Sequence, residues 1–287
     1  MKAIYKKELK SYLTSMVGYL FIAFILLLFG LYFTAINVQQ AYPEIGYALG
    51  NASFVFLIAV PILTMKVLSE EQKNKTDQLL LTAPVRLEEI VLGKYLALLT
   101  IFAIPVCLIC LYPLLLGTHG TVSYPMAYTS ILGFFLLGAA YIAIGVFISS
   151  ITESQVIAAV LSFVLLFFCY MESPIAAFFP ESASGSLFSF VILIALVCLW
   201  IGSMIKNPVV TGVIAICAEG ALIAVYFVKS SLLEGKIQDF LGIFNISDHL
   251  NNFISGMVDL QGIIYFLSVI VVCIFLTIQS LQKKRWN

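Results

Sequence analysis

The sequence predicts an all-α, polytopic membrane protein, and composition and patterning both support this. Hydrophobic residues make up 62% of the 287 residues, charged residues only 10%, and the mean hydropathy is +1.07. A soluble domain is about half apolar and about a quarter charged. The apolar residues also gather in runs long enough to cross a hydrocarbon core of ~30 Å as helices. A soluble enzyme or binding domain is therefore excluded.

Windows of about 20 apolar residues predict about eight transmembrane helices. They are expected near residues 18–38, 47–68, 92–116, 127–149, 155–170, 187–205, 209–228 and 261–281. The fifth window is short. The break at Lys206-Asn207-Pro208 leaves open whether residues 187–228 add two full spans or a re-entrant hairpin.

The distribution of basic residues predicts the orientation of these spans. With the N-terminus inside, every Lys and Arg except Lys229 and Lys236 falls in a segment on the cytoplasmic side, as the positive-inside rule requires. Both termini are therefore expected in the cytoplasm. The net charge is +0, and no basic arm or patch is present that would indicate a nucleic-acid partner.

Residues 1–17 are expected to form a helix in the membrane interface. Apolar and aromatic side chains at helical spacing share one stripe, which lysines flank. The stripe consists of Tyr5, Leu9, Tyr12, Leu13 and Met16, and the lysines are Lys6, Lys7 and Lys10. The alternative is a fraying N-terminus that is merely basic.

The longest polar stretch is EEQKNKTDQLLLTAPVRLEEIVLGK, residues 70–94. Ser69-Glu-Glu-Gln72 has the form of a capping box, which predicts a short helix where the second span leaves the membrane. Pro84 predicts a break, after which Glu88 and Glu89 suit the start of the next helix. Leucines in a cytoplasmic loop suggest docking into a groove of another protein. The alternative is an ordinary loop whose leucines rest on lipid headgroups.

Glu219, in VIAICAEGALIAVYF, is the one carboxylate predicted in the middle of a span. An ionised group there costs ~2.5 kcal/mol or more, so Glu219 is a candidate for a translocation path. The alternative is a protonated or hydrogen-bonded structural residue, or a misplaced span boundary.

No metal site is predicted. Cys107-Leu-Ile-Cys110 has C-x-x-C spacing but lies in an apolar run without a second ligand pair, and the two histidines, His119 and His249, are expected on the outer side. The cysteines are expected to pack as small apolar residues. Gly133 and Gly138 are expected to let helices approach closely in the fourth span.

The chain is not expected to be an enzyme or to bind a cofactor itself. It contains no G-x-x-x-x-G-K-[ST] sequence, and VLGK at residues 91–94 lacks both the preceding glycine and the following Ser or Thr. Any ATP used would be hydrolysed by another subunit.

The segment KNKTDQLLLTAPVRLEEIVLGKYLA resembles the cytoplasmic coupling loop of ABC-2 type transporter permeases. The residues that match in order are Thr76, Leu79, Leu80, Thr82, Pro84, Ile90, Gly93 and Lys94. SSITESQVIAAVLSF, DHLNNFISGMVDLQGIIYFLS and LTIQSLQKKRW also resemble this family, and the C-terminal segments are similar to its gliding-motility-type subgroup.

The resemblance implies a permease subunit of a bacterial cytoplasmic (inner) membrane, built from a six-span core to which residues 187–228 add a helical hairpin. It implies that the subunit dimerises, either with itself or with a second permease carrying an outer domain. It also implies that two cytoplasmic ATPases, which bind ATP and Mg, dock on residues 69–92 and drive outward movement of substrate. The residues then assigned to ATPase coupling are Glu70, Glu71, Thr76, Leu79, Leu80, Thr82 and Pro84.

Two other classes compete with this interpretation. A self-sufficient secondary transporter would use Glu219, but it would be expected to show an internal repeat, and no convincing one is present. An intramembrane protease is suggested only by the Glu70-Glu71 pair, which lies in the predicted cytoplasmic loop, and no His-containing ligand motif is predicted at membrane depth.

Overall fold

The computed structural model describes residues 1–76, 85–118, 120–205, 219–220, 222–223, 226–227, 230 and 233–286. These residues form helices joined by turns, with no strand among them, so the all-α prediction is confirmed. The chain forms two compact units: Met1–Phe168 with Ile246–Asn287, and Cys169–Asn245.

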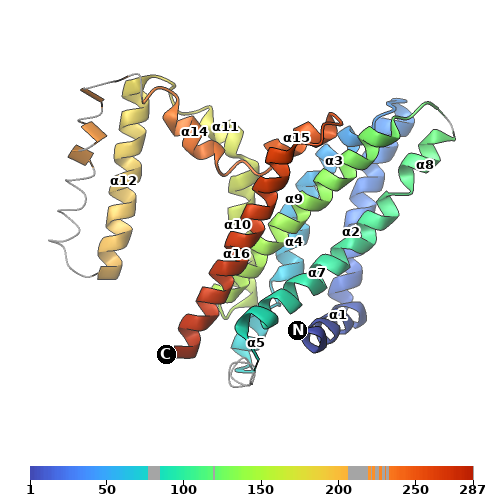
Figure 1. Ribbon diagram of the computed structural model, residues 1–287, viewed down its shortest axis with the longest axis horizontal. Helices are drawn as coiled ribbons and strands as arrows, with labels where there is room; N and C mark the ends of the chain where they lie inside the picture. The colour runs from blue at the N-terminus through green and yellow to red at the C-terminus, as the bar shows by residue number, and fades with distance from the viewer. Residues whose placement is uncertain are drawn as a thin grey trace. The chain divides into compact units, whose positions relative to one another are not determined.

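The first unit contains a bundle of long helices with short helices at its ends (Figure 1). In chain order its elements are α1 (Lys2–Thr14), α2 (Met16–Phe33), the π-helix η1 (Thr34–Gln39), α3 (Ile45–Ala52), the 3₁₀ turn η2 (Ser53–Val55), α4 (Phe56–Thr64), α5 (Ser69–Lys73), α7 (Leu87–Ile109), α8 (Tyr112–Gly117), α9 (Tyr124–Ile151), α10 (Gln155–Tyr170, which ends at the boundary with the second unit), α15 (Asp248–Ile254) and α16 (Leu260–Trp286).

Five helical segments among the described residues are long and apolar enough to cross a membrane, so the prediction of a multi-pass membrane protein is confirmed. They are Met16–Gln39, Ile45–Lys73, Leu87–Gly117, Tyr124–Ile151 and Leu260–Arg285. The window at 155–170 is the shorter helix α10, the window at 187–205 lies within α12 (Ala183–Ile205), and the window at 209–228 falls largely outside the described residues. The count of about eight spans stays a prediction.

The core of the first unit lies around α4 and α9. The apolar windows of Ile45–Lys73 and Tyr124–Ile151 are each 72% buried, whereas those of Met16–Gln39 and Leu260–Arg285 are only 22% buried. Aromatic rings fill the centre: Phe56 of α4 lies 4.6 Å from Phe134 of α9 and 5.5 Å from Phe102 of α7, measured between ring centroids. The apolar faces of the outer helices are therefore largely exposed in the single chain.

Glycines of α9 bring its neighbours close, as the sequence predicted for Gly133 and Gly138. A Cβ at Gly138 would overlap the ring of Phe102, and one at Gly133 would lie 2.5 Å from Cβ of Phe253 in α15. Gly145 has the same role against α4, where a Cβ would overlap the hydroxyl of Thr64. Small residues allow such approaches between membrane helices.

Both ends of the chain lie at the same end of the bundle, which we call the basal end (Figure 1). There the amino group of Met1 contacts Glu89, and Lys284 of α16 contacts Gln72 of α5. We call the opposite end, where α3, α8 and α15 lie, the distal end. The shared end agrees with termini on one side of the membrane; which side this is stays a prediction.

The described residues of the second unit include α11 (Glu172–Ala176), α12 and α14 (Lys236–Gly242). Gln238 of α14 donates a hydrogen bond to the carbonyl oxygen of Phe179 at 2.7 Å. Asn245 donates to the hydroxyl of Ser173 at 2.8 Å. These contacts hold the segment after α14 against the segment around α11.

We predict that Gly145→Ala destabilises the protein, because the added methyl group meets Thr64 in a tightly packed core. The expected cost is about 1–3 kcal/mol. Gly30→Ala in α2 is the matched control, since no atom lies within 4 Å of the position of its Cβ. Thermal unfolding in detergent measures both. Equal melting temperatures for the two variants would contradict the close approach of α4 and α9.

Candidate functional site

The basal end holds a buried lysine, Lys94 of α7, whose side chain is only 2% exposed. Its ammonium group lies 2.9 Å from Oε1 of Glu8, 2.9 Å from Oε1 of Glu71 and 2.9 Å from the carbonyl oxygen of Val67. An ammonium group has three donors and no acceptor, so these oxygens match its capacity. Lys94 thereby joins α1, the turn after α4, α5 and α7.

The start of α7 explains how the lysine reaches this position. Glu88 and Glu89 lie in its first turn, as predicted, where carboxylates favour the helix dipole. Gly93 leaves room for α1, since a Cβ there would lie 3.3 Å from Cγ2 of Ile4. Lys94 follows directly and meets Glu8 one turn further along α1.

The N-terminal helix α1 is anchored on the bundle by its tyrosines. The hydroxyl of Tyr12 donates to the carbonyl oxygen of Leu63 at 3.0 Å, and the hydroxyl of Tyr5 lies 3.0 Å from that of Thr100. Burial raises the pKa of Tyr12, and the nearby carboxylate of Glu8 adds to the effect. These rings, expected at the acyl boundary, have hydrogen-bond partners within the protein. The position of α1 in the membrane interface stays a prediction.

The prediction of a local capping box at Ser69 is wrong. Leu68 is the N-cap residue of α5, and Ser69 is already helical, with its hydroxyl bonded to the carbonyl oxygen of Met65. The backbone N–H groups of Leu68 and Ser69 donate instead to the hydroxyl of Ser149 in α9, at 3.1 and 3.2 Å. A serine from a distant helix therefore supplies the cap that an unsatisfied helix start requires.

The last turn of α9 also binds α5 and α16. The carbonyl oxygen of Ser150 accepts hydrogen bonds from Nε2 of Gln72 at 3.0 Å and from Nζ of Lys284 at 2.9 Å. Lys284 also donates to Oε1 of Gln72 at 2.8 Å. A cation at the C-terminal end of a helix satisfies free carbonyl groups and favours the dipole.

The end of α5 is a tight reversal. The N–H of Thr76 donates to the carbonyl oxygen of Glu71 at 2.9 Å, and that of Lys75 to the carbonyl oxygen of Gln72 at 3.1 Å. Lys75 has φ of 55°, in the left-handed region. These are the bonds of a Schellman motif, which stops a helix and redirects the chain. The reversal fixes the direction in which the chain enters residues 77–84.

The residues assigned to coupling are placed as follows. Thr76 is exposed, Glu70 is half-buried, and the carboxylate of Glu71 faces inward to Lys94, with Lys7 at 3.9 Å. The others, Leu79, Leu80, Thr82 and Pro84, lie outside the described residues. Glu71 therefore holds α5 to the bundle.

Sequence reasoning did not single out the roles of Lys94 and Glu8. A signal was present, because Lys94 stands in the apolar sequence IVLGKYLALL, where a lysine requires a partner. Its partner Glu8 lies 86 residues away in the chain, and no local pattern identifies that pairing.

The remaining candidates are less defined. Glu219 is helical and half-buried, and most of its neighbours along the chain lie outside the described residues. No group of three or more His, Cys, Asp or Glu that could hold a metal ion occurs among the described residues. Among the described cysteines, Cys169 and Cys273 are buried, as expected of small apolar residues, whereas Cys107 is exposed and Cys110 is partly exposed.

We predict that Lys94→Met destabilises the protein by about 3–5 kcal/mol, because it leaves two largely buried carboxylates without the ammonium group between them. Lys7→Met is the control: that side chain is 69% exposed, and exposed ion pairs contribute at most about 1 kcal/mol. Reversible unfolding in mixed micelles measures both. Adding Glu8→Gln and Glu71→Gln to Lys94→Met should recover part of the loss, and no recovery would contradict the pairing.

The comparisons with known proteins agree with this architecture. The sequence model of the family described as ABC-2 family transporter protein matches residues 2–286. No curated protein matches the chain significantly. Since the family match includes both the long helices and the basal cluster around Lys94, the chain belongs to the ABC-2 transporter family, whose members are membrane subunits of ABC transporters.

Proposed function

We propose that this chain is the permease subunit of an ABC exporter and that residues 69–92 form the site on which its cytoplasmic ATPase docks. The family supports a membrane subunit of an ABC transporter. The docking site is supported by the firm attachment of α5 to the bundle, because α5 lies just before residues 77–84 in the chain. Lys94 of α7, Ser149 of α9 and Lys284 of α16 all hold it in place.

Docking of an ATPase can drive transport only if force is transmitted from the docked segment to the bundle. A segment that a partner moves can shift a helix bundle only if the segment is attached firmly to several of its helices. Buried hydrogen bonds and ion pairs resist displacement better than exposed ones do. Movement of α5 would therefore change the packing of α7, α9 and α16 together, and the ATPase would bias two arrangements of the bundle.

ATP and Mg belong to the partner in this proposal, and the permease itself carries out no hydrolysis. The basal end faces the cytoplasm of a bacterium, with both termini there and the chain in the inner membrane. The distribution of Lys and Arg supports this orientation.

The assembly would contain two permease subunits. The C-terminal resemblance to the gliding-motility-type subgroup supports either a homodimer or a heterodimer with a permease that carries an outer domain. Residues 187–228 would add a helical hairpin to the six-span core, and α12 supports its first half.

We predict that Leu79→Asp with Leu80→Asp lowers ATPase binding at least about tenfold, because apolar anchors dominate such interfaces. The measurement is a pull-down from cells that co-express the ATPase genes adjacent to this one. The control, Ser11→Asp with Thr14→Asp, adds the same charge at two exposed basal positions of α1 and should leave binding unchanged.

Two outcomes would count against this proposal. Undiminished binding by the leucine variant would remove the docking site. If the wild-type chain bound none of the co-expressed ATPases, a secondary transporter would become the better interpretation.

We also propose that Glu219 lines the translocation path. Glu219→Gln removes a charge that a substrate would meet, so transport-coupled ATP hydrolysis in proteoliposomes is expected to fall. Glu234→Gln is the control, because Glu234 is exposed. Unchanged ATP hydrolysis by Glu219→Gln would exclude this role.

A further inference from the structure

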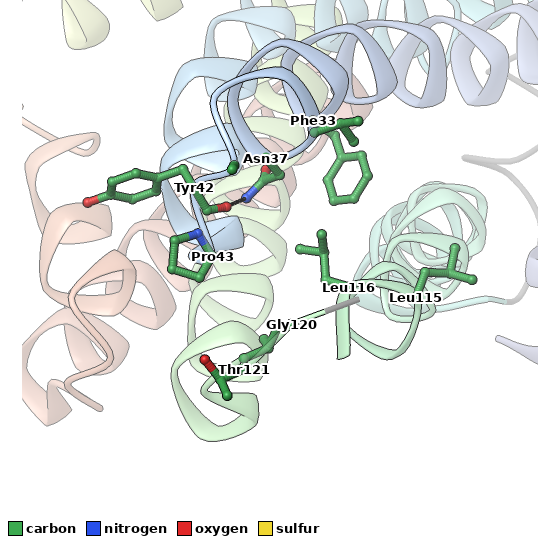
Figure 2. A pocket seen from close by; sticks show the side chains of 11 residues that line it. Phe33, Asn37, Tyr42, Pro43, Leu115, Leu116, Gly120 and Thr121 are labelled. Atoms are coloured by element: carbon green, nitrogen blue, oxygen red, sulfur yellow. Dashed lines mark hydrogen bonds between the residues drawn. The ribbon is translucent and has the colours of Figure 1, made fainter. Parts of the chain in front are cut away.

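The distal end contains a pocket of about 800 Å³ between the end of α2, the turn before α3, and α8. This volume lies in the range of sites that hold drug-sized ligands, ~300–1,000 Å³. Figure 2 shows Phe33 and Asn37 on one side of the pocket, with Leu115 and Leu116 facing them from α8. Gly120 and Thr121 complete the wall below.

The wall of the pocket contains a buried polar residue, Asn37. Asn37 is 4% exposed, and its amide nitrogen donates to the carbonyl oxygens of Tyr42 at 2.8 Å and Glu44 at 3.0 Å. These two bonds fix the orientation of the amide. Its oxygen, Oδ1, is buried and has no hydrogen-bond partner among the described residues. The bonds of the amide nitrogen tie η1 to the turn before α3 and so hold this wall of the pocket in place.

The backbone around Asn37 is irregular in a way that favours a binding site. Asn37 lies in the π-helix η1, and π-helical turns occur frequently at functional sites. Ala41, which also lines the pocket, has φ of 55°, in the left-handed region that a residue with a Cβ adopts at a cost. The surrounding structure therefore maintains an unfavourable conformation at the wall of this pocket.

The rim of the pocket is apolar and exposed. Val38 is 58% exposed, Leu115 59% and Tyr42 39%. The rim lies where the spans Met16–Gln39 and Leu87–Gly117 end, so it meets the membrane near one of its surfaces. No lining residue carries a formal charge among the described part of the chain. This chemistry fits an acyl chain and offers no cation to bind a phosphate group.

We infer that this pocket binds a membrane phospholipid, with one acyl chain between η1 and α8. The inference is independent of ATPase docking, because the pocket lies at the distal end and its test needs only the permease. The lipid, rather than a second protein copy, is the occupant that the uncharged apolar walls and the membrane-facing rim favour.

The test uses the full-length chain in nanodiscs that contain a phosphatidylethanolamine with a diazirine on its acyl chain. After illumination, peptide mass spectrometry should place most of the label in residues 33–43 and 115–122. Leu116→Trp fills the pocket and should lower labelling at least about tenfold. Leu27→Trp, on the exposed face of α2 at 59% exposure, is the control and should label as the wild type does.

Excess unlabelled phosphatidylethanolamine should displace the probe from these residues. Labelling spread evenly over the exposed faces of α2 and α16, or retained in Leu116→Trp, would overturn the site itself. If Leu116→Trp does not fold, Val122→Phe blocks the pocket from its other wall and is read in the same way.

Discussion

The basal end of this protein depends on the burial of one ammonium group. Removing Lys94 from water is costly, and the structure offsets this with two carboxylates and a carbonyl oxygen, all at 2.9 Å. Such a cluster adds little net stability compared with apolar packing, but an unpaired member is strongly unfavourable. The cluster therefore mainly fixes the relative positions of α1, α5 and α7, because their charged groups can pair only when these helices lie in a narrow range of positions.

This geometry extends to α9 and α16 through uncharged groups. Ser149 caps the start of α5, and the carbonyl oxygen of Ser150 receives Gln72 and Lys284. The side chains of Glu71 and Gln72 in α5 thus bind the bundle, while Lys73, Asn74, Lys75 and Thr76 are exposed. A partner that approached from the basal side would meet these exposed residues and the segment that follows them. Any force that this partner exerted on α5 would reach the bundle through Glu71 and Gln72.

The sequence was sufficient for features that depend on periodicity and composition. The five helical segments long and apolar enough to cross a membrane follow from apolar runs, and the close approach at Gly133 and Gly138 follows from residue size. The capping box failed because Ser149, eighty residues further along the chain, accepts from the N–H of Ser69 that Gln72 was expected to satisfy, and the N–H of Gln72 donates to the carbonyl oxygen of Leu68. The Lys94 cluster and the distal pocket were missed for the same reason. Each joins segments that only the packed bundle brings together.

The two ends of the bundle are connected by the same helices. The helix α2 connects α1, which carries Glu8, to η1, which lines the distal pocket. The helix α7 carries Lys94 and leads toward α8, which forms the opposite wall of that pocket. A helix transmits displacement along its axis because its backbone bonds resist extension. If nucleotide-driven movement of α5 shifts α7 relative to α2, the two walls of the pocket move relative to each other. By thermodynamic linkage, a lipid bound between those walls would then favour one of the two arrangements of the basal end. The coupling free energy would equal that by which this arrangement favours lipid binding.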